Sequence, residues 1–241
     1  MRYWLVMPAA GVGRRFGTTR PKQYAPLEGR TVIEWALAPF LADSECAGIA
    51  VALADEDPYW DEVADRLTRF PGRKPELIRA EGGAERSHTV RKGLEALRAR
   101  AKADDWVLVH DAARPCLSSS DLQQLLTSLG SHPVGGILAT PAADTLKRAA
   151  AGGEIEQTVN RAGLWRALTP QMFRYERLCE ALDRALAGGR LPTDEAQALE
   201  WIGDRPALVQ GSAANIKITS ADDLVLAAAL LKAHASPPPA V

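Results

Sequence analysis

Short apolar runs that alternate with helical segments constrain the fold of this chain more than any other feature. Continuous apolar runs at residues 3–7, 48–54 and 106–110 are too short for helices and are typical of strands buried on both faces. Residues 76–79 predict a further short strand. Because helical stretches separate these runs, we expect a mostly parallel sheet in an α/β fold, with ligands at the carboxyl ends of its strands.

The helical stretches carry their own start signals and apolar faces. Residues 31–34 read as a capping box that starts a helix reaching residue 41, and residues 57–69 form a second helical stretch. In a third stretch, one helix face collects four apolar residues: Val90, Leu94, Leu97 and Ala101. A helix is also predicted at 175–187, where two glycines end it.

The alternation lapses after residue 140. Two short candidate strands, 145–147 and 155–159, flank a small-residue connection, which fits either a projecting hairpin or an irregular surface excursion. Thr193 is a candidate N-cap for the next helix, and residues 215–219 alternate like a strand. We therefore expect one domain over 1–235 with a β-arm at about 141–163, followed by a disordered tail at 236–241.

Composition narrows the class of protein. The 241 residues are 46% hydrophobic and carry a net charge of −1, which argues against a broad nucleic-acid surface. No run approaches the roughly 18 apolar residues of a membrane span, and no export signal is apparent, so no membrane partner is expected. Cys46, Cys116 and Cys179 are widely spaced, as in a cytoplasmic protein with reduced cysteines.

A glycine-rich loop follows the first predicted strand. Its backbone can close on an anion because its side chains are small: Ala9, Ala10, Gly11 and Gly13. Arg14 and Arg15 come next, and Lys22 follows. The loop lacks the Gly-Lys-Ser/Thr of a Walker motif, and Phe16 replaces the third small residue of a dinucleotide fingerprint. Cations beside the loop favour a reacting triphosphate, whose leaving group needs stabilisation.

Asp111 ends the clearest buried strand, at the same predicted sheet edge as the glycine turns at 11–13 and 82–83. A carboxylate there suits Mg²⁺, which typically takes one or two carboxylates plus substrate phosphates, although a structural N-cap is the alternative. His110 is a less favoured general base, since adjacent strand residues face opposite sides and one of the pair should be buried. The absence of a Gly-x-Ser-x-Gly elbow makes a serine hydrolase a poor match.

Eight segments together make the chain resemble a known family. They are residues 8–15 (PAAGVGRR), 21–24 (PKQY), 82–86 (GGAER), 109–115 (VHDAARP), 160–165 (NRAGLW), 169–171 (TPQ), 193–196 (TDEA) and 215–219 (NIKIT). This set resembles the 2-C-methyl-D-erythritol 4-phosphate cytidylyltransferases. The resemblance implies a Rossmann-like nucleotidyltransferase fold and a homodimer built through the β-arm. It also implies Mg²⁺-dependent transfer of CMP from CTP to 2-C-methyl-D-erythritol 4-phosphate, in the non-mevalonate isoprenoid pathway.

The resemblance also implies roles for individual residues. Catalytic roles fall to Arg15, Lys22 and Lys217, and the Mg²⁺ ligand is Asp111. CTP binding falls to Ala9, Ala10, Gly11, Gly13, Gly83, Arg86, Thr89 and Ala112. Acceptor binding falls to Arg114, Thr145, Arg161, Thr193 and Lys217. Without the resemblance, Lys217 and Arg161 would read as ordinary solvated side chains.

Three positions depart from common family patterns: Ala84 where Asp can occur, Thr89 where Ser is usual, and Asn160 where Asp often stands. Thr89 keeps the hydroxyl, whereas Ala84 offers only backbone contacts for discriminating the base. Two other functions remain open on the residues alone. One is a related nucleotidyltransferase, such as a ribitol-phosphate or sugar-1-phosphate enzyme. The other is a nucleotide-binding regulator without turnover, against which the cations Arg15, Lys22 and Lys217 argue.

Overall fold

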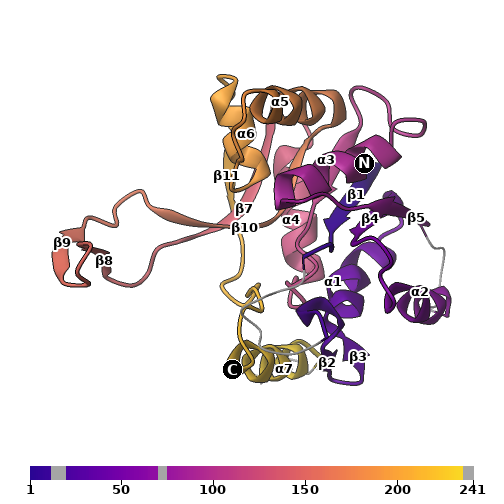
Figure 1. Ribbon diagram of the computed structural model, residues 1–241, viewed down its shortest axis with the longest axis horizontal. Coiled ribbons are helices and arrows are strands. Elements are labelled where there is room, and N and C mark those ends of the chain that lie inside the picture. The colour runs from indigo at the N-terminus through magenta and orange to yellow at the C-terminus, as the bar shows by residue number, and fades with distance from the viewer. Residues whose placement is uncertain (12–19, 70–74, 236–241) are drawn as a thin grey trace.

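The computed structural model describes residues 1–11, 20–69 and 75–235, and a seven-stranded sheet organises them (Figure 1). The strand order is β11-β7-β10-β6-β1-β4-β5. The strands are β1 (Tyr3–Pro8), β4 (Cys46–Leu53), β5 (Glu76–Glu81), β6 (Trp106–Val109), β7 (Gly135–Pro141), β10 (Trp165–Arg174) and β11 (Ala207–Gln210). All neighbours pair in parallel except β10, which is antiparallel to both β6 and β7. The predicted mostly parallel α/β sheet is confirmed.

Helices cover both faces of this sheet because alternate strand residues point to opposite sides. Along β1, Leu5 and Met7 join one buried cluster with α1 (Val32–Leu41), α2 (Trp60–Thr68) and α4 (Ser119–Leu129). Val6, between them, joins the opposite cluster with α3 (Arg86–Ala96), α5 (Tyr175–Ala187) and α6 (Glu195–Trp201). A third cluster seats α7 (Asp222–Ala235) beside the small hairpin of β2 (Pro26–Leu27) and β3 (Arg30–Thr31).

The β-arm, residues 141–163, leaves the body as a long extension (Figure 1). Its tip is a two-stranded antiparallel sheet of β8 (Leu146–Ala149) and β9 (Ile155–Val159). The projecting hairpin is therefore the correct one of the two sequence interpretations. Its apolar side chains have little cover within the chain, and Ile155 is 66% exposed.

Three local predictions are wrong. Residues 215–219 form no strand: Asn215 and Ile218 are both buried, although a strand would place them on opposite faces. The segment docks on the loop after β6 instead, where the Ile218 amide donates to the Ala113 carbonyl at 2.8 Å. The cap of α6 is Asp194, whose side chain accepts from the Gln197 amide at 2.9 Å, in place of Thr193. The third helical stretch ends at Ala96, so Ala101 lies beyond α3.

Two strands were not predicted, and one prediction falls on residues that the structure does not describe. The sequence patterns missed β10 and β11 altogether. The tail predicted to be disordered, 236–241, lies outside the described residues.

Two glycines with positive φ allow a matched test of how β7 meets β10. Gly135 has φ of 114°, and a Cβ there would lie 2.1 Å from the Met172 carbonyl oxygen. Gly153, in the arm, has φ of 92° but no heavy atom within 4 Å of such a Cβ. Backbone strain alone costs roughly 1–3 kcal/mol at either position. We expect Gly135→Ala to lower the free energy of unfolding well beyond this amount and Gly153→Ala to stay within it, as measured by chemical denaturation. Equal losses would contradict the close approach.

Candidate active site

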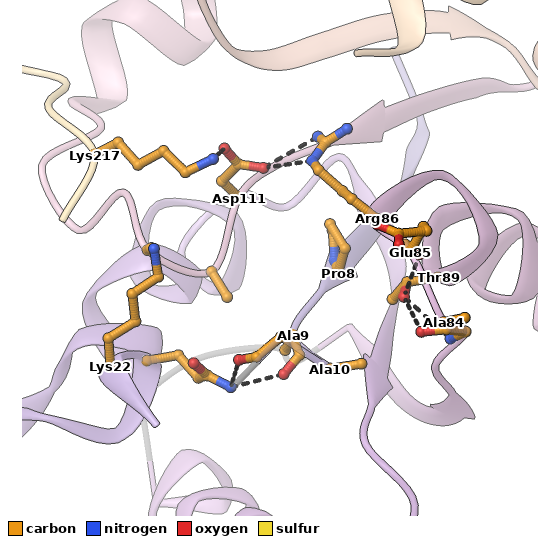
Figure 2. Close-up of a pocket in the computed structure, with 15 residues that line it drawn as sticks. Pro8, Ala9, Ala10, Lys22, Ala84, Glu85, Arg86, Thr89, Asp111 and Lys217 are labelled. Carbon is orange, nitrogen blue, oxygen red and sulfur yellow. Dashed lines mark hydrogen bonds and ion pairs between the residues drawn. The ribbon is translucent and has the colours of Figure 1, made fainter. Parts of the chain in front are cut away.

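A pocket opens at the carboxyl edge of the parallel strands, where the sequence predicted a ligand site (Figure 2). The loops after β1, β5 and β6 contribute most of its wall, and the chain after β11 adds one lysine. The lining residues are Pro8, Ala9, Ala10, Gly11, Lys22, Gln23, Gly83, Ala84, Glu85, Arg86, Thr89, Asp111, Ala112, Ala113 and Lys217. Of the predicted CTP-binding residues, Gly13 lies outside the described residues and all the others line this pocket.

The described start of the first glycine loop, residues 9–11, is fixed by hydrogen bonds to its backbone. The buried Gln23 side chain donates to the carbonyls of Ala9, at 2.7 Å, and Gly11, at 3.2 Å. The Ala9 amide donates to the Ala52 carbonyl on β4 at 2.8 Å. These contacts hold the loop with small side chains facing the pocket, as the sequence predicted.

The second glycine turn lies directly against the first loop. A Cβ on Gly82 would lie 2.2 Å from the Cβ of Ala10, so only glycine allows this approach. The Gly83 amide donates to the Thr89 hydroxyl at 3.0 Å, and that hydroxyl lies 3.0 Å from the Glu85 carbonyl, to which it can donate. Thr89 therefore lines the pocket, and its hydroxyl also stabilises the turn.

Asp111 lies at the centre of the charged part of the pocket, with cations on both sides (Figure 2). Its carboxylate lies 3.0 Å from Arg86, 2.8 Å from the Lys217 ammonium and 3.6 Å from the Arg114 Nε. Burial alone would raise the pKa of Asp111, but Arg86, Lys217 and Arg114 outweigh burial and hold that pKa well below its usual range. The residue is therefore a stable carboxylate.

Glu195 is a charged residue of this network that the sequence analysis did not single out. It is the first residue of α6, is 1% exposed, and binds the Arg86 guanidinium through both oxygens, at 2.6 and 3.1 Å. Burial raises the pKa of Glu195, and Arg86 opposes that shift. Acidic residues are common at helix N-termini, so Asp194 and Glu195 together indicate only the start of a helix. The sequence alone therefore gives no reason to place Glu195 in the site.

His110 is a buried structural residue, as its place beside Asp111 suggested. Its Nδ1 lies 2.9 Å from the Thr169 hydroxyl, which accepts from the Asp111 amide at 3.1 Å. Its Nε2 lies 3.1 Å from the Arg114 carbonyl. A neutral ring protonated at Nε2 satisfies all three contacts. His110 therefore holds both ends of the loop that carries Asp111, and it has no exposed surface for acid–base chemistry.

The two predicted catalytic lysines are linked through one irregular segment. The Lys22 ammonium donates to the Ile218 carbonyl at 2.9 Å, and the neighbouring Lys217 binds Asp111. Both side chains line the pocket, and both lie at its left side in the view of Figure 2. The third predicted catalytic residue, Arg15, lies outside the described residues.

The predicted acceptor-binding residues are dispersed within a single chain. Lys217 lines the pocket, but Arg114 is buried behind it and donates to the Asn215 carbonyl at 2.7 Å. Thr193 is exposed, and its amide donates to the Gln197 side chain at 2.8 Å. Thr145 and Arg161 are exposed and belong to the β-arm, and this segment extends away from the body (Figure 1). One chain therefore assembles the predicted nucleotide half of the site but not the acceptor half.

Within the described ranges, no group of three or more His, Cys, Asp or Glu side chains could hold a metal ion by itself. A metal ion in this pocket would need oxygen atoms from a molecule bound there, in addition to the carboxylate of Asp111. Among the same residues, no helix is long and apolar enough to cross a membrane.

The buried His110 predicts a specific pH dependence of stability. Burial lowers the pKa of His110 to about 4, against about 6.5 in an unfolded chain. Between these values only the unfolded state binds the proton, so the free energy of unfolding should fall as the pH drops from about 6.5 towards 4. His110→Gln removes this titration, and its denaturation midpoints should depend less on pH in this window. The same slope in both proteins would contradict a neutral, buried His110.

Comparisons with known proteins agree with this geometry. The sequence profile of the 2-C-methyl-D-erythritol 4-phosphate cytidylyltransferase family matches residues 3–233. The member from Halorhodospira halophila is 54% identical over 97% of this chain and 95% of its own length. The member from Ectopseudomonas mendocina is 51% identical over 92% of this chain and 93% of its own length.

Solved structures agree with the sequence relatives. A crystal structure of 4-diphosphocytidyl-2C-methyl-D-erythritol synthase superposes with a TM-score of 0.82 and 39% identity, covering 96% of this chain and 100% of its own. The enzyme from Thermus thermophilus has a TM-score of 0.75 and 32% identity, with 96% of this chain and 100% of its own covered. The expected Rossmann-like nucleotidyltransferase fold is confirmed, and the chain belongs to the 2-C-methyl-D-erythritol 4-phosphate cytidylyltransferase family.

Proposed function

We propose that this chain transfers CMP from CTP to 2-C-methyl-D-erythritol 4-phosphate, which releases pyrophosphate and forms 4-diphosphocytidyl-2-C-methyl-D-erythritol for isoprenoid synthesis. The observation that carries the proposal is the pocket at the sheet edge. It combines a small-residue loop, an anchored glycine turn, a buried carboxylate and two lysines, of which Lys217 pairs with that carboxylate. The assignment of the family supports the choice of CTP and of this acceptor.

The reaction needs charge stabilisation and positioning more than proton transfer. The acceptor phosphate is already ionised at neutral pH, so its oxygen can attack the α-phosphorus of CTP without a general base. The pocket agrees with a reaction of this kind. The histidine next to Asp111, His110, is buried, and both of its ring nitrogens are hydrogen-bonded within the protein. Lys22, together with Arg15 of the glycine-rich loop, would stabilise the negative charge that develops on the phosphates.

We propose Mg²⁺ as the cofactor and Asp111 as its protein ligand. The fit rests on the donors: Asp111 is an ionised carboxylate facing the pocket, and hard oxygen donors suit this ion. One carboxylate is enough where substrate phosphates complete the ligand set. When bound, the ion would neutralise phosphate charge and orient the leaving pyrophosphate.

We further propose that two chains pair through their β-arms, and that each arm completes the acceptor site of its partner. The arm exposes apolar side chains that one chain leaves uncovered, which a second copy could cover across a two-fold axis. Thr145 and Arg161 would then reach the pocket of the partner chain. The acceptor would be held there together with the other residues predicted to bind it: Arg114, Thr193 and Lys217.

A cytoplasmic location suits this reaction because it uses CTP and releases pyrophosphate. The three cysteines are free thiols, and burial raises the pKa of Cys46 to about 12. Such thiols are packed and poorly reactive, as in reduced cytoplasmic proteins.

The proposed reaction is tested by pyrophosphate release from CTP with a panel of acceptors. We expect turnover with 2-C-methyl-D-erythritol 4-phosphate in Mg²⁺, and loss of turnover after chelation. Faster reaction with ribitol 5-phosphate would favour the related cytidylyltransferase, and absence of pyrophosphate would favour a nucleotide-binding regulator. Equal turnover without divalent ions would contradict the Mg²⁺ proposal alone.

The shared site is tested by mixing two inactive variants. Lys22→Ala should lower kcat by roughly 10²–10³-fold, the scale for loss of one stabilising group. Arg161→Ala should remove acceptor binding. After dissociation and reassociation, each heterodimer would hold one site with both residues intact if Arg161 acts in trans. Random pairing makes half the dimers mixed, so about a quarter of the wild-type activity should return. No recovery, with heterodimers present, would reject the shared site.

A further inference from the structure

Arg86 is held between two carboxylates instead of facing the pocket freely. Its Nε and NH2 contact Asp111 Oδ1, at 3.1 and 3.0 Å, while NH1 and NH2 contact the two oxygens of Glu195. All three guanidinium nitrogens are therefore engaged in ion pairs. Because the geometry is bidentate towards Glu195, rotation of the guanidinium is restricted. The position of Arg86 against Asp111 is thus set from the opposite side, by a residue that does not line the pocket.

Glu195 lowers the net positive charge of the cluster around Asp111. Arg86, Arg114 and Lys217 supply three positive charges, and Asp111 and Glu195 supply two negative charges, which leaves a net charge of +1. Without the Glu195 charge, the same cluster would carry +2. Since Glu195 is buried, its charge acts on this cluster through protein and is weakly screened by salt.

We propose that Glu195 is a positioning residue that neutralises Arg86, so that the Asp111 carboxylate stays available to a divalent cation. The inference rests on the proposed role of Asp111 as the metal ligand. With Glu195 in place, Arg86 is shared between two carboxylates. Without it, the whole Arg86 charge falls on Asp111 and competes with the metal.

This role predicts opposite effects on cation and anion binding. Glu195→Gln keeps the side-chain size and removes one negative charge. It should raise the Kd of Mn²⁺ about tenfold, the scale expected for one charge acting on a divalent ion through protein. It should leave the Kd of CTP in EDTA unchanged or lower, because added positive charge favours a triphosphate. A merely structural lesion would weaken both.

Two further variants separate charge from folding. Arg86→Gln lowers the net charge of the cluster, so Mn²⁺ should bind more tightly and metal-free CTP more weakly. The double variant Arg86→Gln/Glu195→Gln restores a net charge of +1 and should recover near-wild-type Mn²⁺ affinity. If Glu195→Gln alone fails to fold, these two variants still decide the question, because failure of either expected change would overturn the proposal.

The chain offers two matched controls. Asp194→Asn removes the same charge from the same end of α6, with Asn able to serve as the N-cap. Glu34→Gln removes a buried carboxylate paired with Arg66, at 2.9 Å, outside this pocket. Neither contacts Arg86 or Asp111, so both should alter Mn²⁺ affinity much less than Glu195→Gln does.

The readout is direct: Mn²⁺ binding by electron paramagnetic resonance, and CTP binding in EDTA by calorimetry. The proposal stands if Glu195→Gln weakens only Mn²⁺ binding and the double variant recovers it. Equal weakening of both ligands, or unchanged Mn²⁺ binding, would overturn it. A wild-type protein that binds no Mn²⁺, even with CTP, would instead contradict the proposed metal site from which the inference starts.

Discussion

The ion pairs of one buried carboxylate tie the active-site edge together. Taking Asp111 out of water is costly, and its contacts with Arg86, Arg114 and Lys217 offset that cost. The cations come from different places: the start of α3, the loop after β6 and the irregular chain after β11. Each segment must reach its place for these three ion pairs to form. The charge therefore constrains the arrangement of segments that are far apart in the sequence.

The antiparallel strand β10 contributes the neutral part of the same arrangement. Its pairing with β7 shifts register between Ala167 and Gln171, which frees the polar groups of Thr169 from the ladder. Those groups accept from the Asp111 amide and from the Asn215 side chain, at 3.1 and 2.7 Å. Gln171 then accepts from the Ala196 amide, at 3.0 Å, and so anchors α6, which carries Glu195. A strand with polar, buried residues thus positions both ends of the charged network.

This explains which parts of the fold the sequence could predict. Strands β1, β4 and β6 are continuous apolar runs, so local composition identifies them, and the first glycine loop follows the end of β1. Strand β10 contains Thr169, Pro170 and Gln171, which read locally as a loop. Their burial is stabilised by partners far away in the sequence, such as Asp111, 58 residues from Thr169, and no local pattern contains that information.

The same limit applies to the site. Asp111 was predictable because it ends an apolar strand at a sheet edge. Lys217 was not predictable from its segment, because the alternation of residues 215–219 indicated a strand with a solvated face, whereas tertiary contacts hold the segment against Ala113. Only the resemblance to a family assigned Lys217 to the site, and the structure places it in the pocket. The position of Lys217 thus depends on a long-range ion pair with Asp111, and a local sequence pattern contains no information about such a pair.

The geometry of the arm has a consequence for how the two halves of the reaction could be coupled. The sheet edge holds the described residues assigned to CTP within one chain, whereas Thr145 and Arg161 are carried on an extension with exposed apolar residues. Burying those residues between two arms would stabilise a dimer and, in the same step, bring the acceptor residues to a pocket. Under this arrangement a lone chain could still bind the nucleotide, because its ion pairs are internal. Acceptor binding would instead depend on association, because the groups proposed to recognise the acceptor would then come from two chains.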